Sequence, residues 1–158
     1  MAKKPVTLFR NTHQAAAQHH GSRSTTSGAF TAPTRHAIDW FEIPVRDLDR
    51  AITFDEALLA TTIRRQTIGD SALGIIKYDA ESVGGCLCRF QDAEAPQPSL
   101  DGALVYLNAG PSLDAALARA ESLGARITTP KVTLPGDMGC FAHIVDTEGN
   151  RVGLHARV

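Results

Sequence analysis

Hydrophobic and polar positions repeat one order of elements twice along the chain, in two blocks separated by a proline-containing stretch. In the first block, residues 37–45 alternate as a strand does. Apolar residues at helical spacing follow Asp47, which is a favoured helix N-cap residue. Three short strands are predicted next, at residues 62–68, 72–77 and 84–90. The first block therefore predicts one strand, one helix and three further strands.

The second block begins with a predicted strand at residues 103–108, after a linker at residues 91–101 that contains Pro96 and Pro98. Ser112 is placed to cap a second helix, and Gly124 is placed to end that helix at the C′ position. Strands are then predicted at residues 126–132, 139–145 and 151–156. The second block thus has the same element order as the first.

The repeat extends to individual residues at the start of each predicted helix. Leu48-Asp49-Arg50-Ala51-Ile52 returns as Leu113-Asp114-Ala115-Ala116-Leu117. A chain of 158 residues is long enough to bury the core of one domain. The sequence therefore predicts an α+β domain at residues 36–158, built from two tandem βαβββ modules at about residues 36–91 and 101–158.

Residues 1–35 differ from the rest of the chain. They show no sustained apolar periodicity, and no acidic residue precedes Asp39. Such a segment cannot bury enough apolar surface to offset its ordering entropy, so a disordered tail is expected. A basic, Ser-rich start is also typical of an organelle-targeting peptide, which remains the alternative to a simple tail.

Composition and charge exclude several classes of partner. The net charge of −1 provides no overall field that would attract nucleic acid or an anionic membrane. No apolar run approaches the roughly 20 residues that span a bilayer. The three cysteines, Cys86, Cys88 and Cys140, are an odd number without the density of a disulfide scaffold. Free thiols in the cytoplasm are therefore expected, with Cys86 and Cys140 as packing residues.

Three local motifs occur in the order typical of one known superfamily. They are Trp40-Phe41-Glu42-Ile43-Pro44-Val45-x-Asp47-Leu48, the second-helix string Leu113–Arg119, and the turn Asp146-x-x-Gly149-Asn150. Together they resemble the glyoxalase/bleomycin resistance protein/dioxygenase (vicinal oxygen chelate) superfamily, although Thr147 stands where that turn usually has proline. The resemblance implies a curved eight-stranded cup, a small-molecule ligand and a homodimer.

In metal-dependent members of this superfamily, four inward-facing His or Glu residues hold one divalent ion that stabilises an enediolate. In this chain the first ligand position falls on Trp40 and the last on Gly153. Residues 83–90 contain no His, Asp or Glu, and residues 103–108 contain no His. The resemblance therefore points to a glyoxalase-like subgroup without the usual metal ligands. Substitute donors for a divalent metal would be Glu42, His143 and His155.

Glu42 is the first candidate catalytic residue. A carboxylate between Phe41 and Ile43 on a central strand is costly to bury unless it is paired or functional. It is either a general base whose pKa is raised by desolvation, or the partner of an arginine such as Arg89 or Arg151. His155 is the second candidate for proton transfer.

The expected ligand-binding residues follow from the implied cup. Trp40 and Tyr106 would either wall the pocket or fill it as core. His143 faces into the cup or out of it, depending on the strand register. The full set of candidate binding residues is Trp40, Tyr106, Asn108, Phe141, His143 and Gly153.

Two functions are compatible with these residues. The first is a metal-independent glyoxalase-like enzyme of lyase or isomerase type, related to lactoylglutathione lyase, in which Glu42 or His155 transfers a proton on a small oxygenated metabolite. The second is a non-catalytic protein that sequesters a small molecule, as bleomycin-resistance members do. An aromatic-walled pocket with few polar groups suits either function.

Overall fold

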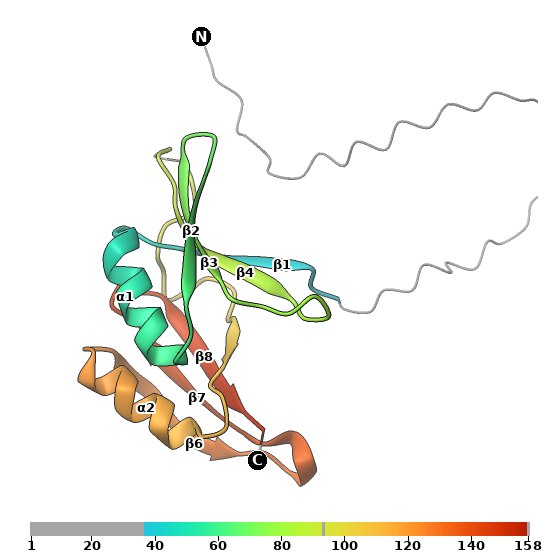
Figure 1. Ribbon diagram of the computed structural model, residues 1–158. Helices are drawn as coiled ribbons and strands as arrows, with labels where there is room; N and C mark the ends of the chain where they lie inside the picture. The colour runs from blue at the N-terminus through green and yellow to red at the C-terminus, as the bar shows by residue number, and fades with distance from the viewer. Residues whose placement is uncertain (1–36, 93, 158) are drawn as a thin grey trace, which may run out of the picture. The chain divides into compact units, whose positions relative to one another are not determined.

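A computed structural model describes residues 37–92 and 94–157 (Figure 1). The expected tail at residues 1–35 lies outside these described residues. The first module contains β1 (Trp40–Pro44), α1 (Leu48–Leu59), β2 (Ile63–Ile68), β3 (Ser71–Ile76) and β4 (Gly84–Arg89). The second contains β5 (Tyr106–Asn108), α2 (Leu113–Ser122), β6 (Arg126–Thr133), the short 3-10 helix η1 (Gly136–Met138), β7 (Cys140–Val145) and β8 (Arg151–Ala156).

The strands form two four-stranded sheets with the same topology. The strand order is β1-β4-β3-β2 in the first sheet and β5-β8-β7-β6 in the second. In each sheet the first pair of strands is parallel and the other two pairs are antiparallel. The predicted α+β fold of two tandem βαβββ modules is therefore confirmed.

Two predicted strands are shorter than expected, because a strand needs a neighbour to bond. The first begins at Trp40, whose register partner Gly84 is also the first residue of β4. The β5 strand begins at Tyr106, opposite Gly153, although the carbonyl of Val105 still accepts from the Gly153 N–H at 2.9 Å. The alternation of apolar and polar residues begins before Trp40 and before Tyr106, but the strand pairing begins only at these residues.

The predicted helix caps are confirmed. The Asp47 side chain accepts hydrogen bonds from the backbone N–H groups of Asp49 and Arg50, both at 3.0 Å. The Ser112 hydroxyl accepts from the N–H of Ala115 at 3.2 Å. Gly124 follows α2 with a φ of +93°, a conformation that glycine adopts without steric cost.

Both helices pack on one face of the sheets, and Figure 1 shows α1 and α2 side by side. The Arg119 guanidinium on α2 donates two hydrogen bonds, of 3.0 and 2.8 Å, to the carbonyl of Leu58 near the end of α1. A Cβ atom at Gly74 on β3 would lie 3.0 Å from Ile52 Cγ1 on α1, so this glycine permits the close helix approach. The face of each sheet away from the helices is called its open face below.

A second, smaller apolar cluster lies on the open face of the first sheet. It contains Leu73, Ile75, Cys86 and Cys88, with Trp40 packed against them. Burial, and then the nearby charge of Glu42, raises the pKa of both thiols to about 12. Both cysteines are therefore packing residues that do not ionise near neutral pH, and Cys140 is buried in the main core.

The turn between β7 and β8 ties the second module to the first. The buried Glu148 carboxylate accepts from the backbone N–H groups of Arg46 at 2.7 Å and Asp47 at 3.0 Å, just before α1. It also accepts from Arg50 Nε at 2.6 Å. Burial alone would raise the pKa of Glu148, but the hydrogen bonds from Arg50 and from these amides outweigh burial and lower it.

The other two residues of the turn motif have structural roles as well. Asp146 Oδ1 accepts from the backbone N–H groups of Glu148, Gly149 and Asn150 at 2.8–2.9 Å. The Asn150 side chain donates to the carbonyl of Pro44 at 2.9 Å. The motif that carries the family resemblance therefore builds the junction between the modules.

Asp55 on α1 is a buried carboxyl at this junction, with only 6% of its surface exposed. Burial, together with the charges of Asp146 and Glu148, raises its pKa to about 8. Within the described part of the chain no hydrogen bond reaches it. Among the same residues, no helix has the length and apolar composition needed to cross a bilayer.

Candidate functional site

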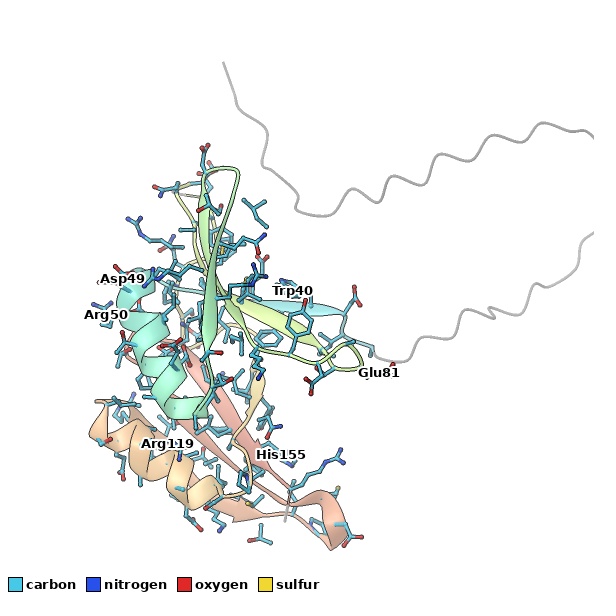
Figure 2. All side chains as sticks on the ribbon, in the orientation of Figure 1. Trp40, Asp49, Arg50, Glu81, Arg119 and His155 are labelled. Carbon is cyan, nitrogen blue, oxygen red and sulfur yellow. The ribbon has the colours of Figure 1, made fainter. Side chains whose placement is uncertain are left out.

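The open face of the second sheet gathers six of the candidate residues. Figure 2 shows His155 on this sheet and Trp40 on the first sheet, both on the side away from the helices. The strand register places Tyr106, Gly153 and His143 in one row across β5, β8 and β7. The adjacent row contains Asn108, His155 and Phe141. The register therefore places His143 on the open face.

Gly153 provides space for the ring of Tyr106. A Cβ atom at position 153 would lie 2.6 Å from Tyr106 Cε1 and 2.8 Å from Tyr106 Cγ, which is too close for any real contact. The ring thus crosses β8 directly over the Gly153 backbone. Its hydroxyl reaches His143 on β7, with 2.8 Å between Tyr106 Oη and His143 Nε2.

A line of three hydrogen-bonding side chains results. His143 Nδ1 lies 2.9 Å from the hydroxyl oxygen of Thr129 on β6, so both ring nitrogens have a hydroxyl partner. In one tautomer Tyr106 donates to Nε2 and Nδ1–H donates to Thr129; in the other both directions reverse. His143 can therefore exchange a proton with the Tyr106 hydroxyl without rearrangement of heavy atoms, while Thr129 stays bonded to Nδ1.

Thr129 was not among the residues singled out from the sequence. Its pairing with His143 follows two register shifts in the β6–β7 ladder, one on each side of Thr129. A simple count along an unbulged hairpin would not identify it. The partial signal in the sequence is only that a β-branched hydroxyl residue occurs on the neighbouring strand.

Aromatic rings surround this line. Tyr106 and Phe141 meet edge to face at 6.0 Å between centroids, and Phe141 lies 5.2 Å from the His143 ring. Such contacts hold the rings in fixed orientations. Tyr106 nevertheless keeps 47% of its surface exposed, which leaves part of its ring and its edge open to a ligand.

A recess of about 450 Å³ lies beside Tyr106. Its lining includes Asn108, His155 and Arg157. His155 Nε2 lies 2.7 Å from the carbonyl of Met138. A carbonyl can only accept, so Nε2 carries hydrogen and Nδ1 of neutral His155 has the free lone pair. His155 can therefore accept a proton only through Nδ1.

Glu42 lies apart from this recess. It lines a separate slot of about 220 Å³ between β1, the linker and β8, together with Ser99 and Arg151. The expected pairing with Arg89 or Arg151 is wrong for the described part of the chain, where no ion pair joins Glu42 to either. Arg89 Nε instead donates to the carbonyl of Arg46 at 3.2 Å. The structure therefore does not bring the two catalytic candidates, Glu42 and His155, into one pocket.

Trp40 lies on the first sheet and not in the recess. Its ring meets Tyr78 edge to face at 5.9 Å. A Cβ atom at Gly84 would lie 2.7 Å from Trp40 Cζ3, so this glycine makes room for an aromatic ring in the same way as Gly153. Trp40 is half-buried against the smaller apolar cluster, and the first sheet uses it mainly as packing.

The divalent ion that the resemblance implies does not fit these side chains. The two outer ligand positions are Trp40 and Gly153, and the Tyr106 ring occupies the space over Gly153. Across residues 37–92 and 94–157, no group of three or more His, Cys, Asp or Glu residues could hold a metal ion. Both nitrogens of His143 already have partners.

Comparison with solved structures identifies the fold. A glyoxylase/bleomycin resistance protein/dioxygenase domain from Frankia sp. EAN1pec matches with a TM-score of 0.60 and 16% identity, over 78% of this chain and 93% of that one. Glyoxalase I from Zea mays matches with a TM-score of 0.53 and 23% identity, over 75% of this chain and 45% of that one. The fosfomycin resistance protein FosX from Listeria monocytogenes matches with a TM-score of 0.53 and 14% identity, over 78% and 94%.

No protein-family model matches the sequence, and no curated protein sequence does. The chain therefore resembles these proteins in fold. At sequence identities of 14%, 16% and 23%, the resemblance shows the fold alone. The chain has the fold of the glyoxalase/bleomycin resistance/dioxygenase proteins.

Proposed function

We propose that this protein is a glyoxalase-like member of the vicinal oxygen chelate superfamily that acts on a small oxygenated metabolite without the usual metal. The observation that carries the proposal is the hydrogen-bonded line from Thr129 through His143 to the exposed Tyr106 on the open face of the second sheet. A positioned imidazole with a hydroxyl on each nitrogen suits general acid–base catalysis. The site would lie between β5, β7 and β8.

The proposed reaction is a proton transfer beside a carbonyl group. A ligand C–H gives its proton to Tyr106 Oη while the Tyr106 hydroxyl proton moves to His143 Nε2, and the resulting imidazolium keeps its Nδ1–H bonded to the Thr129 hydroxyl. The C–H electron pair forms the enolate. The isomerisation is complete when the proton returns to the neighbouring carbon and the ligand's hydroxyl proton passes to the former carbonyl oxygen. Every proton stays within the ligand and the three side chains.

Deuterium exchange tests this proposal. Dihydroxyacetone in D₂O is the probe, and incorporation of deuterium at its carbons is followed by NMR with and without protein. Tyr106→Phe keeps the ring over Gly153 but removes the hydroxyl, so exchange should fall by about 10²-fold or more, the usual contribution of a general acid or base. Tyr78→Phe is the matched control, because Tyr78 is an exposed tyrosine in the loop between β3 and β4 whose ring contacts Trp40 and not His143. Equal exchange by wild type and Tyr106→Phe would refute the role of Tyr106.

Sequestration of a small molecule is the second candidate function. It is favoured by one observation: the only carboxylate among the candidate residues, Glu42, lies in a separate slot and cannot assist at Tyr106. A sequestering protein would bind dihydroxyacetone, with shifts of the Tyr106 and His143 resonances, but would give no exchange above the buffer rate. The same NMR experiment therefore separates the two functions.

We also propose that the protein is a homodimer, as the resemblance implies, and that it is located in the cytoplasm. Large apolar side chains, among them Ile38, Tyr78 and Met138, are about half exposed or more, so a second copy would have apolar surface to cover. The three thiols are free, as expected of a reducing compartment. Analytical ultracentrifugation would test the dimer, and a single species at 16.9 kDa would refute it.

A further inference from the structure

The recess beside Tyr106 has an unbalanced set of polar groups. Its lining residues are Tyr106, Leu107, Asn108, Gly110, His155 and Arg157, and none of these carries a carboxylate. Arg157 has no hydrogen bond or ion pair to any residue that the structure describes. A guanidinium without a partner at the rim of a recess is a ready partner for an anion, because it offers two parallel N–H donors.

Asn108 presents a second donor to the same recess. Its Oδ1 atom accepts a hydrogen bond of 2.9 Å from the backbone N–H of Gly110. An amide group has its oxygen and its nitrogen on opposite sides, so this bond fixes the orientation of the side chain. The Nδ2 group has no partner among the described residues and is available to donate to a ligand.

The Tyr106 ring forms a flat wall of the recess. The Gly153 backbone beneath it and the bond to His143 hold the ring in place, so no rotamer freedom has to be lost when a ligand stacks on it. An exposed, fixed ring favours a planar partner, because planar groups make offset stacking contacts that a puckered ring cannot.

We propose that the ligand of this recess is a planar carboxylate, with its ring or conjugated system on Tyr106 and its carboxylate on Arg157 and Asn108 Nδ2. This inference rests on the proposed function and adds the chemical class of the ligand. It assigns Arg157 and Asn108 as the residues that select charge, and Tyr106 as the residue that selects shape.

Three matched probes test the assignment: benzoate, its neutral amide benzamide, and the puckered cyclohexanecarboxylate. Dissociation constants are measured by ¹H–¹⁵N NMR titration at low ionic strength. Benzoate should bind up to about fivefold more tightly than benzamide, the usual effect of an ion pair with a solvent-exposed arginine. It should also bind more tightly than cyclohexanecarboxylate. Salt at about 0.1 M should reduce the preference for benzoate over benzamide, because salt screens charge. The same salt should leave the preference for benzoate over cyclohexanecarboxylate unchanged.

Variants test which residues cause the preferences for charge and for a planar ring. Arg157→Gln should bring the benzoate affinity down to that of benzamide, without changing the benzamide affinity. Arg126→Gln is the control, because Arg126 is also an exposed arginine on the second sheet but does not line the recess. Tyr106→Leu should remove the preference for benzoate over cyclohexanecarboxylate.

The outcomes separate this inference from the function on which it rests. If benzoate and benzamide bind equally and shift the same resonances of the recess, the charge assignment is overturned and small-molecule binding stands. If the preference for benzoate survives Arg157→Gln, Arg157 is not the selecting residue and the inference also fails. If none of the three probes shifts Asn108, Tyr106 or His155, both the inference and the proposed location of the site are overturned.

Discussion

Tyr106 and Gly153 share one space, because the aromatic ring of Tyr106 lies directly on the backbone of Gly153. A Cβ atom at position 153 would stand 2.6 Å from Tyr106 Cε1. The glutamate that the family resemblance implies at position 153 and the ring at position 106 therefore exclude each other.

Gly153→Ala should displace the Tyr106 ring and break its bond to His143. Overpacking of this kind costs about 1–3 kcal/mol in the free energy of unfolding. Chemical denaturation measures that loss, and NMR titration with benzoate should show weaker binding. Gly102→Ala is the control, because no atom lies within 4 Å of a Cβ built there. Unchanged stability and binding in Gly153→Ala would contradict the described position of the ring.

Glu148→Gln should loosen the junction between the modules. Loss of the negative charge weakens the hydrogen bonds from Arg50 and from the amides before α1, so the free energy of unfolding at neutral pH should fall by about 2 kcal/mol. The pKa of Glu148 is lowered in the folded state, so its contribution is present above the unfolded value of 4.5 and is lost as the pH falls through the folded value. Urea denaturation of both proteins should therefore converge in acid, and a constant difference at all pH values would count against this account.

Asp55→Asn should act in the opposite pH direction. The pKa of Asp55 rises from 3.8 in the unfolded chain to about 8 in the fold, so the folded state holds the proton more tightly. The contribution of Asp55 to stability is then fully present below about pH 4 and falls as the pH rises towards about 8, by at most about 1.4 kcal/mol per pH unit. An asparagine cannot ionise, so this loss should be absent in the variant. Parallel stability curves for the two proteins, measured from pH 4 to 8, would refute a buried, protonated Asp55.

Thr147→Pro should stabilise the protein by about 0.4–1 kcal/mol through the unfolded state. Thr147 is the second residue of the turn closed by Gly149 N–H and the Asp146 carbonyl at 3.2 Å, a position that proline favours. Its hydroxyl is buried without a hydrogen-bond partner among the described residues. Thermal unfolding measures the change, and a clear drop in Tm would show that the backbone at 147 does not fit proline.

The sequence predicted the fold because its local signals agree with one another. Asp47, Ser112 and Gly124 are cap residues whose chemistry determines where a helix begins or ends, and each has that role in the structure. The alternation of β7 and β8 agrees with the structure, since Phe141, Gly153 and His155 lie on the face opposite the buried Ala142 and Leu154.

The details of the site depend on contacts across strands, which local patterns do not contain. Thr129 pairs with His143 only because of the irregular register of β6. Glu42 and His155 line different pockets, and residues of the linker line only the pocket of Glu42. Asp55 lies beside a turn more than 90 residues later in the chain, so its burial and its raised pKa could not be predicted from local sequence. Arg157 stands out only once the recess around it is known.

The two buried thiols of the first sheet can be used to measure local unfolding of that sheet. Cys86 and Cys88 are fully covered, and an alkylating reagent reacts with the thiolate, a form that their burial suppresses. Iodoacetamide can therefore label them only when local unfolding exposes them. The labelling rate at increasing urea concentration measures how often this unfolding occurs. If the second sheet unfolds independently, Cys140 should be labelled at a different rate. A time course of labelling, followed by mass spectrometry, would therefore show whether the two modules unfold together.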